Sequence, residues 1–147
     1  MLAKGCFPPK QNFEEMNKLA ADGLDFYFIQ CSMLANVEGI ARFGAMLANN
    51  GINPSTGERV VSPATVKATV TLMQTCGMYD GAGKFTKNHG VPSKSGVAGG
   101  LMTVIPGLGA VGSWSPPLDE EGNSVKAIAM IDELSKVYNN INLFYKD

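Results

Sequence analysis

The sequence predicts an α+β fold in which helical segments come first, followed by an antiparallel hairpin and a C-terminal helix. Apolar residues recur at helical spacing up to about residue 78, and beyond it two β-type runs flank a Gly-rich turn. Helices segregated along the chain from an antiparallel sheet are typical of the α+β class. The 147 residues fit one domain, with a helical part over about 1–78 and the sheet with the terminal helix over about 92–147.

The first helical segments have recognisable start signals. Asn12 stands three residues before Glu15, a capping-box pattern, and we expect this helix to end at Gly23. The apolar segment 24–32 is expected to form a second, buried helical turn region.

Two further helices are predicted before the sheet. Asn36 can cap a helix whose apolar face ends at Asn49–Gly51, and small residues on this face permit close packing. Ser62 and Pro63 form an N-cap and N1 pair that opens a helix through Cys76.

The second half predicts strands at 97–105 and 110–114, joined by the turn Pro106–Gly109. A short strand is expected to begin at Ser124, and apolar residues from Ile128 to Ile141 predict the terminal helix. We expect the hairpin and this helix to pack together. Because a two-stranded sheet is marginal in water, the hairpin should need further strands from elsewhere.

Charge and hydropathy disfavour several classes of partner. Twelve basic and thirteen acidic side chains are dispersed without a Lys/Arg cluster, so neither nucleic acid nor membrane is an expected partner. There is neither an apolar run of the ~18 residues that span a bilayer nor a signal-peptide pattern. We expect an intracellular location, cytoplasmic or in the mitochondrial matrix.

The cysteines and the single histidine give no metal-binding pattern. Cys6, Cys31 and Cys76 are far apart and are expected to be reduced thiols. A catalytic cysteine would have to use His89, the sole histidine, which we expect in a loop. No cofactor and no metal are expected, and the acidic run Asp119–Glu121 is expected to be a solvated loop without a role.

The triplet Lys94–Gly96 precedes a predicted strand. An ammonium, a hydroxyl and exposed backbone N–H groups in this place can bind a carboxylate or an oxyanion. Three such residues also occur by chance, with Lys94 then a surface charge. Trp114 and Phe85 are expected to pack or to line the pocket wall.

Several segments, in this order, resemble the serine-dependent glutaminases, a family similar in fold to serine β-lactamases and penicillin-binding proteins. The resemblance runs over nearly the whole chain and implies that residues 1–147 are the C-terminal part of a glutaminase domain. The segments that carry it are Asp25–Phe28, Met46–Gly51, Thr56–Arg59, Cys76–Asp80, Lys94–Gly100 and Trp114–Asp119.

The resemblance implies hydrolysis of L-glutamine to L-glutamate and ammonia through a serine acyl-enzyme. Tyr79 would relay the nucleophile's proton, Tyr27 would lie beside it and contact substrate, and the backbone N–H of Val97 would contribute to the oxyanion hole. The alternative for both tyrosines is a core residue with a satisfied hydroxyl, and for the glycines around Val97 a strand with a bulge.

The nucleophile is missing, because no serine of this chain is followed at the third position by lysine, as the family's S-x-x-K motif requires. The isolated chain is therefore expected to be inactive, and its partners to be L-glutamine and either a second copy or the missing N-terminal half. One alternative is a non-catalytic fragment that docks on a glutaminase through its free sheet edge. Another, a penicillin-interactive hydrolase, lacks a recognisable S-x-N loop here.

Overall fold

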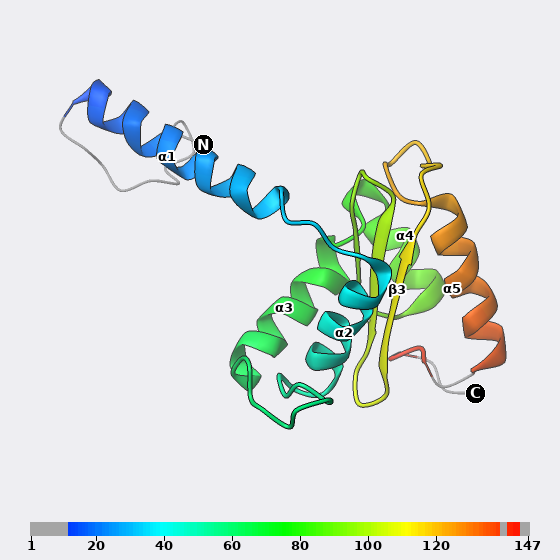
Figure 1. Cartoon of the computed structure of the whole chain (residues 1–147). Coiled ribbons are helices and arrows are strands. Elements are labelled where there is room, and N and C mark those ends of the chain that lie inside the picture. The colour runs from blue at the N-terminus through cyan, green and yellow to red at the C-terminus, as the bar shows by residue number, and fades with distance from the viewer. Residues whose placement is uncertain (1–11, 139–140, 145–147) are drawn as a thin grey trace. The chain divides into compact units, whose positions relative to one another are not determined.

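The computed structural model describes residues 12–138 and 141–144 and divides the chain into two compact units, Met1–Ala35 and Asn36–Asp147. Figure 1 labels the main helices and the outer strand. Each unit is described by itself.

The described part of the first unit contains one helix, α1 (Phe13–Cys31). Asn12 caps it as predicted, because its side-chain oxygen accepts the backbone N–H of Glu15 at 2.8 Å. The expected end at Gly23 is wrong, since α1 continues through this residue; a glycine inside a helix costs only about 1 kcal/mol relative to alanine. The expected burial of the 24–32 segment is also wrong, because no residue of α1 is buried.

The helices α2 (Val37–Ala48) and α3 (Pro63–Cys76) open the second unit. Both caps are confirmed: Asn36 accepts the N–H of Gly39, and Ser62 accepts the N–H of Thr65. A short 3-10 turn, η2 (Tyr79–Gly81), and a helix, α4 (Ala82–His89), then follow. The sequence did not predict α4, which has only eight residues, among them Gly83 and one large apolar side chain, Phe85.

The sheet has three antiparallel strands in the order β1 (Ser93–Ser95), β2 (Gly100–Ile105) and β3 (Gly109–Trp114). The predicted hairpin is confirmed with Gly100 opposite Trp114, but residues 97–99 form a turn instead of strand. The expected extra strand comes from within this chain, as β1. Ser124 begins no strand: its hydroxyl accepts the N–H of Ala127 and caps α5 (Val125–Val137).

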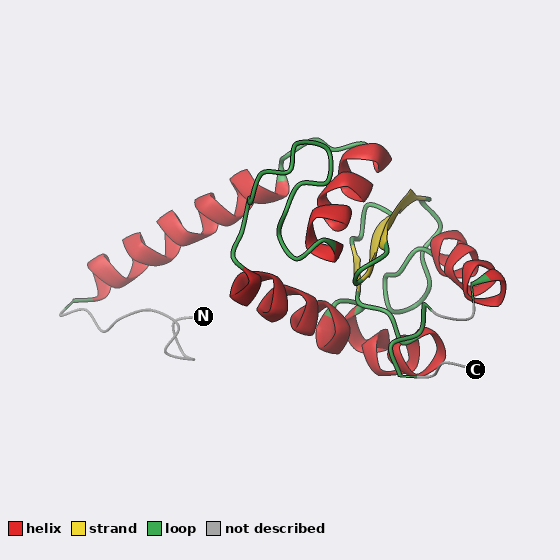
Figure 2. Cartoon of the chain, turned by 90° about the horizontal axis from the view of Figure 1, so that it is seen from below, coloured by secondary structure: helices red, strands yellow, loops and turns green. Residues whose placement is uncertain are grey.

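Alternating side chains of β2 contribute to two apolar clusters, so helices pack on both faces of the sheet (Figure 2). Val104 belongs to the cluster formed with α2 and α3. On this face the sheet lies close to α2, because a Cβ added to Gly112 of β3 would stand 2.4 Å from the carbonyl oxygen of Val37. Leu101 and Ile105 belong to the other cluster, with α4 and α5. The predicted packing of hairpin and terminal helix is confirmed.

His89 is not the loop residue expected but ends α4, with only 4% of its surface exposed. Its Nε2 lies 2.5 Å from Oδ1 of Asp132 in α5, and its Nδ1 lies 3.0 Å from the carbonyl oxygen of Phe85. The buried ring is therefore held between a backbone carbonyl of α4 and a carboxylate of α5. His89 thus links α4 to α5. Cys31 and Cys76 are free thiols, and Cys6 lies outside the described residues.

Candidate active site

The turn after β1 contains Val97, whose backbone N–H is the predicted oxyanion donor. Gly99 donates to the carbonyl of Gly96 at 2.8 Å, which closes a four-residue turn with Val97 in its second position. The Val97 N–H makes no hydrogen bond to another described residue, and 71% of the residue's surface is exposed. The turn therefore leaves a fixed, unused donor where the resemblance implies an oxyanion hole.

Neighbouring groups hold this turn in place. The indole N–H of Trp114 donates to the carbonyl of Ala98 at 2.8 Å, and Ser115 donates to the carbonyl of Gly99 at 2.9 Å. Gly99 has φ +94°, and a Cβ there would stand 2.3 Å from the carbonyl oxygen of Ser115. Glycine is thus required at this position.

Tyr79 has φ +51°, a left-handed backbone conformation that is rare for a bulky residue. Such a conformation costs of the order of 1–3 kcal/mol and persists only where the surroundings impose it. The Nζ of Lys94 lies 4.9 Å from the centroid of the Tyr79 ring, within cation–π range, and also donates to the carbonyl of Ser95. The side chain is 40% exposed, so Tyr79 is a surface tyrosine and not the core residue of the alternative interpretation.

Tyr79 and Val97 meet at Gly122. A Cβ on Gly122 would lie 3.8 Å from Val97 Cγ1 and 3.9 Å from two carbons of the Tyr79 ring. Two of the three predicted site residues therefore border the same small space, although they are separated in sequence. The Nζ of Lys94 contacts the ring of the same tyrosine.

Tyr27, the third predicted residue, lies in α1 and therefore in the other unit. Its ring contacts that of Phe28, with 6.1 Å between the centroids. Its place beside Tyr79 and Val97 stays a prediction.

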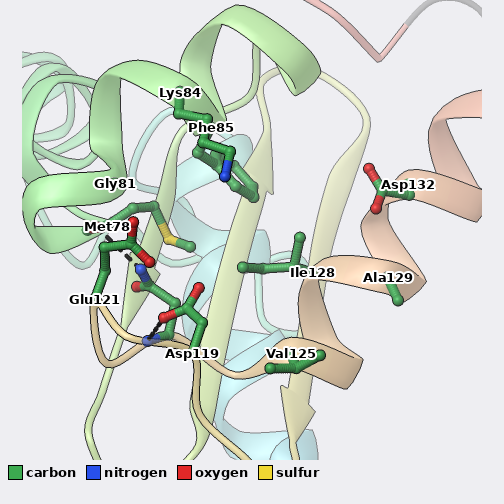
Figure 3. Close-up of a pocket in the computed structure, with 11 residues that line it drawn as sticks. Met78, Gly81, Lys84, Phe85, Asp119, Glu121, Val125, Ile128, Ala129 and Asp132 are labelled. Carbon is green, nitrogen blue, oxygen red and sulfur yellow. Dashed lines mark hydrogen bonds between the residues drawn. The ribbon is translucent and has the colours of Figure 1, made fainter.

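The acidic loop is solvent-exposed at Glu120 and Glu121, as expected, whereas Asp119 makes hydrogen bonds within the loop. A carboxylate oxygen of Asp119 accepts the N–H of Asn123 at 2.7 Å, and the Asp119 N–H donates to the carbonyl of Asn123 at 2.8 Å. This loop borders a cavity of about 310 Å³ between α4 and α5, shown in Figure 3, which Met78 and Phe85 also line. Phe85 is buried and stacks on His89, as expected of a packing residue.

Within the described ranges, no cluster of His, Cys, Asp and Glu side chains could hold a metal ion, and no helix is long and apolar enough to cross a membrane. The chemistry available at the Tyr79 and Val97 site is that of a phenol, an ammonium and a backbone donor. These groups can transfer a proton and stabilise an oxyanion, but the site contains no activated nucleophile.

A free backbone donor beside a tyrosine and a lysine is an arrangement that can serve acyl transfer. Residues 9–144 match the family model of the glutaminases, and the chain belongs to this family. It is 48% identical over 115 residues to Glutaminase 2 of Clostridium perfringens and 43% identical over 125 residues to a glutaminase of Nostoc.

Solved structures agree with the family. A probable glutaminase from Bacillus subtilis complexed with 6-diazo-5-oxo-L-norleucine is 35% identical with a TM-score of 0.78, over 82% of this chain and 42% of that one. A second structure, Mglu in its glutamate form, is 41% identical with a TM-score of 0.75, over 80% of this chain and 27% of that one. The fold is part of the β-lactamase-like fold of these glutaminases.

This chain corresponds to less than half of its relatives. The match covers 78% of this chain but 38% of the Clostridium protein, and 85% of this chain but 37% of the Nostoc protein.

Sequence reasoning missed two residues at the site, Gly122 and Asn123. Gly122 adjoins the Tyr79 ring and Val97, and Asn123 donates to the carbonyl of Met78. In the sequence, the Gly–Asn pair after the acidic run indicates a turn. It does not indicate which distant residues the turn contacts.

Proposed function

We propose that this chain is the C-terminal portion of a glutaminase domain, which hydrolyses L-glutamine to L-glutamate and ammonia when a serine nucleophile is supplied from outside the chain. The observation that carries the proposal is the unused N–H of Val97 beside the exposed Tyr79, in a chain of the glutaminase family. In the proposed scheme, Tyr79 and Tyr27 contact the substrate and the reacting groups.

The reaction has two halves. The serine oxygen attacks the side-chain amide carbon, and the resulting oxyanion accepts hydrogen bonds from Val97 N–H and from the nucleophile's own N–H. Tyr79 takes part in moving the serine proton to the departing nitrogen, so that ammonia leaves and an ester remains. Water then adds to the ester and releases glutamate and the free serine.

The ligands of the solved relatives support this substrate class. One Bacillus subtilis glutaminase was solved as a covalent complex with 5-oxo-L-norleucine formed by reaction with 6-diazo-5-oxo-L-norleucine, at 35% identity and a TM-score of 0.75. Another relative was solved in its glutamate form. Both ligands named are amino acids related to glutamine in length and α-substituents.

The test measures ammonia release from L-glutamine by two proteins. The isolated chain should show no turnover above buffer, because it has no S-x-x-K serine. A chimera in which this chain replaces the matched segment of Clostridium perfringens Glutaminase 2 should be active. An inactive, folded chimera, or robust turnover by the isolated chain, would contradict the proposal.

A second candidate is a non-catalytic fragment that docks on a glutaminase. Two observations favour it: α1 buries none of its residues, and β3 pairs only with β2 among the described strands. Such a free strand edge can accept a strand from another chain. The test is size-exclusion chromatography of this chain mixed with an intact glutaminase relative. Co-elution of the two proteins supports docking, and separate elution removes this candidate.

The remaining assignments follow from the same proposal. The partner is the missing part of the domain or a second copy of this chain. Free thiols at Cys31 and Cys76 support a reducing intracellular compartment, the cytoplasm or the mitochondrial matrix.

A further inference from the structure

We propose that Asn123 is the positioning residue that holds Tyr79 in its left-handed conformation. The amide Nδ2 of Asn123 donates to the carbonyl oxygen of Met78 at 3.2 Å, across 45 residues of sequence. This carbonyl belongs to the peptide that joins Met78 to Tyr79, so its direction fixes the backbone from which the Tyr79 ring projects. The proposal rests on the proposed function only where it concerns turnover.

The Met78 carbonyl has two donors among the described residues. One is the N–H of Gly81 at 3.1 Å, which any turn of this length would supply. The other is Asn123, the only one that comes from a distant segment. The side chain of Met78 is 2% exposed and packs in the apolar cluster of α4 and α5, so both the side chain and the carbonyl before Tyr79 are held.

Asn123 is itself fixed on both sides of its backbone. Asp119 accepts its N–H and donates to its carbonyl, and Figure 3 shows Asp119 on the loop that faces Met78. A Cβ added to the adjacent Gly122, which has φ +90°, would be in ordinary van der Waals contact with the Tyr79 ring and with Val97. One loop therefore contacts the backbone before Tyr79 through Asn123 and adjoins the Tyr79 ring at Gly122.

The chemistry of the contact requires a neutral hydrogen-bond donor. Because a carbonyl oxygen only accepts, the group that faces Met78 must be a donor, and it must be neutral where 2% of the residue is exposed. The other end of the amide, Oδ1, is buried and has no hydrogen-bond partner in the structure. The bond to Met78 is therefore the hydrogen bond that this side-chain amide makes among the described residues.

The test compares Asn123→Ala with Gln74→Ala in the 147-residue chain. Gln74 is a matched control: its Nε2 donates at 2.9 Å to a side chain of another helix, Thr86, and its Oε1 is also buried without a partner. The measurement is the set of Tyr79 backbone Cα, Cβ and amide shifts by NMR, which report the sign of φ.

Asn123→Ala should move the Tyr79 shifts away from left-handed values while both variants remain folded, and Gln74→Ala should leave them unchanged. If Asn123→Ala does not fold, Asn123→Ser, which keeps a small donor, replaces it and should give a partial shift. Unchanged Tyr79 shifts in the Asn123 variants, or an equal shift in Gln74→Ala, would overturn the proposal.

A second measurement uses the active chimera. Asn123→Ala should lower kcat by about 10-fold or more with little change in KM, since a displaced general acid–base group affects the transition state. Gln74→Ala should change neither constant by more than about twofold. Equal losses in both variants would contradict a positioning role, whereas an inactive parent chimera would count against the proposed function and leave the NMR result to decide this one.

Discussion

The two segments that meet at Gly122 are built in different ways. The Val97 turn is local: its closing hydrogen bond joins Gly96 to Gly99, and its braces come from the strand end directly opposite. Tyr79 lies in a strained conformation whose long-range support comes from Asn123. A donor that must stay in one place can be held by an unstrained turn, whereas a side chain that must project from a crowded position needs support from elsewhere in the fold.

The largest loss of kcat is expected from a substitution at Tyr79. In the active chimera, Tyr79→Phe should lower kcat by on the order of 10²-fold, because it removes the hydroxyl that transfers the proton and keeps the ring. Tyr138→Phe, at the end of α5 and also partly exposed, is the control and should leave kcat unchanged. A fully active Tyr79→Phe enzyme would remove this residue from the catalytic scheme.

The turn should respond to crowding at Gly99. Gly99→Ala places a Cβ against the carbonyl of Ser115, so the turn must shift, and turnover should fall by on the order of 10-fold. The matched control is Gly107→Ala, which has φ +78° and nothing within 4 Å of the added carbon. If the two substitutions reduce turnover equally, backbone strain alone explains the loss and the position of the turn does not matter.

A polar pair away from the site should affect stability and leave the chemistry unchanged. His89→Leu removes both hydrogen bonds of a buried ring and should lower the free energy of unfolding by about 1–3 kcal/mol, measured by urea denaturation of the isolated chain. Asp132→Asn keeps an acceptor on a half-exposed side chain and should cost less, about 0–1 kcal/mol. A His89→Leu chain that unfolded at the same urea concentration as the parent chain would show that the pair does not contribute to stability.

The difference between the two segments also explains what the sequence could predict. The role of the Val97 N–H was predicted from the resemblance of Lys94–Gly100 to the glutaminases, whereas the turn that contains Val97 was predicted to be strand. The strain at Tyr79 could not be predicted, because it depends on a contact across 45 residues that no local pattern encodes.

The same reasoning applies to the fold. The capped helices α2 and α3 and the β2–β3 hairpin were predicted because Asn36, Ser62 and the 106–109 turn are local signals. The helix α4, the three-residue strand β1 and the continuation of α1 through Gly23 were missed. In the first two, the structure depends on packing between distant segments, which overrides weak local propensity.

The most direct test of the account is a pair of substitutions at Val97 in the active chimera, read out as ammonia release from L-glutamine. Ala98 is not among the residues with positive φ, so the turn is not of type II and accords with type I, in which proline is favoured at the second position. Val97→Pro therefore deletes the N–H with little strain, and Val97→Ala keeps it. The account predicts a kcat lowered by about 10²–10³-fold for Val97→Pro and within about threefold of the parent for Val97→Ala. Equal kcat values for the two variants would contradict the assignment of this N–H to the oxyanion.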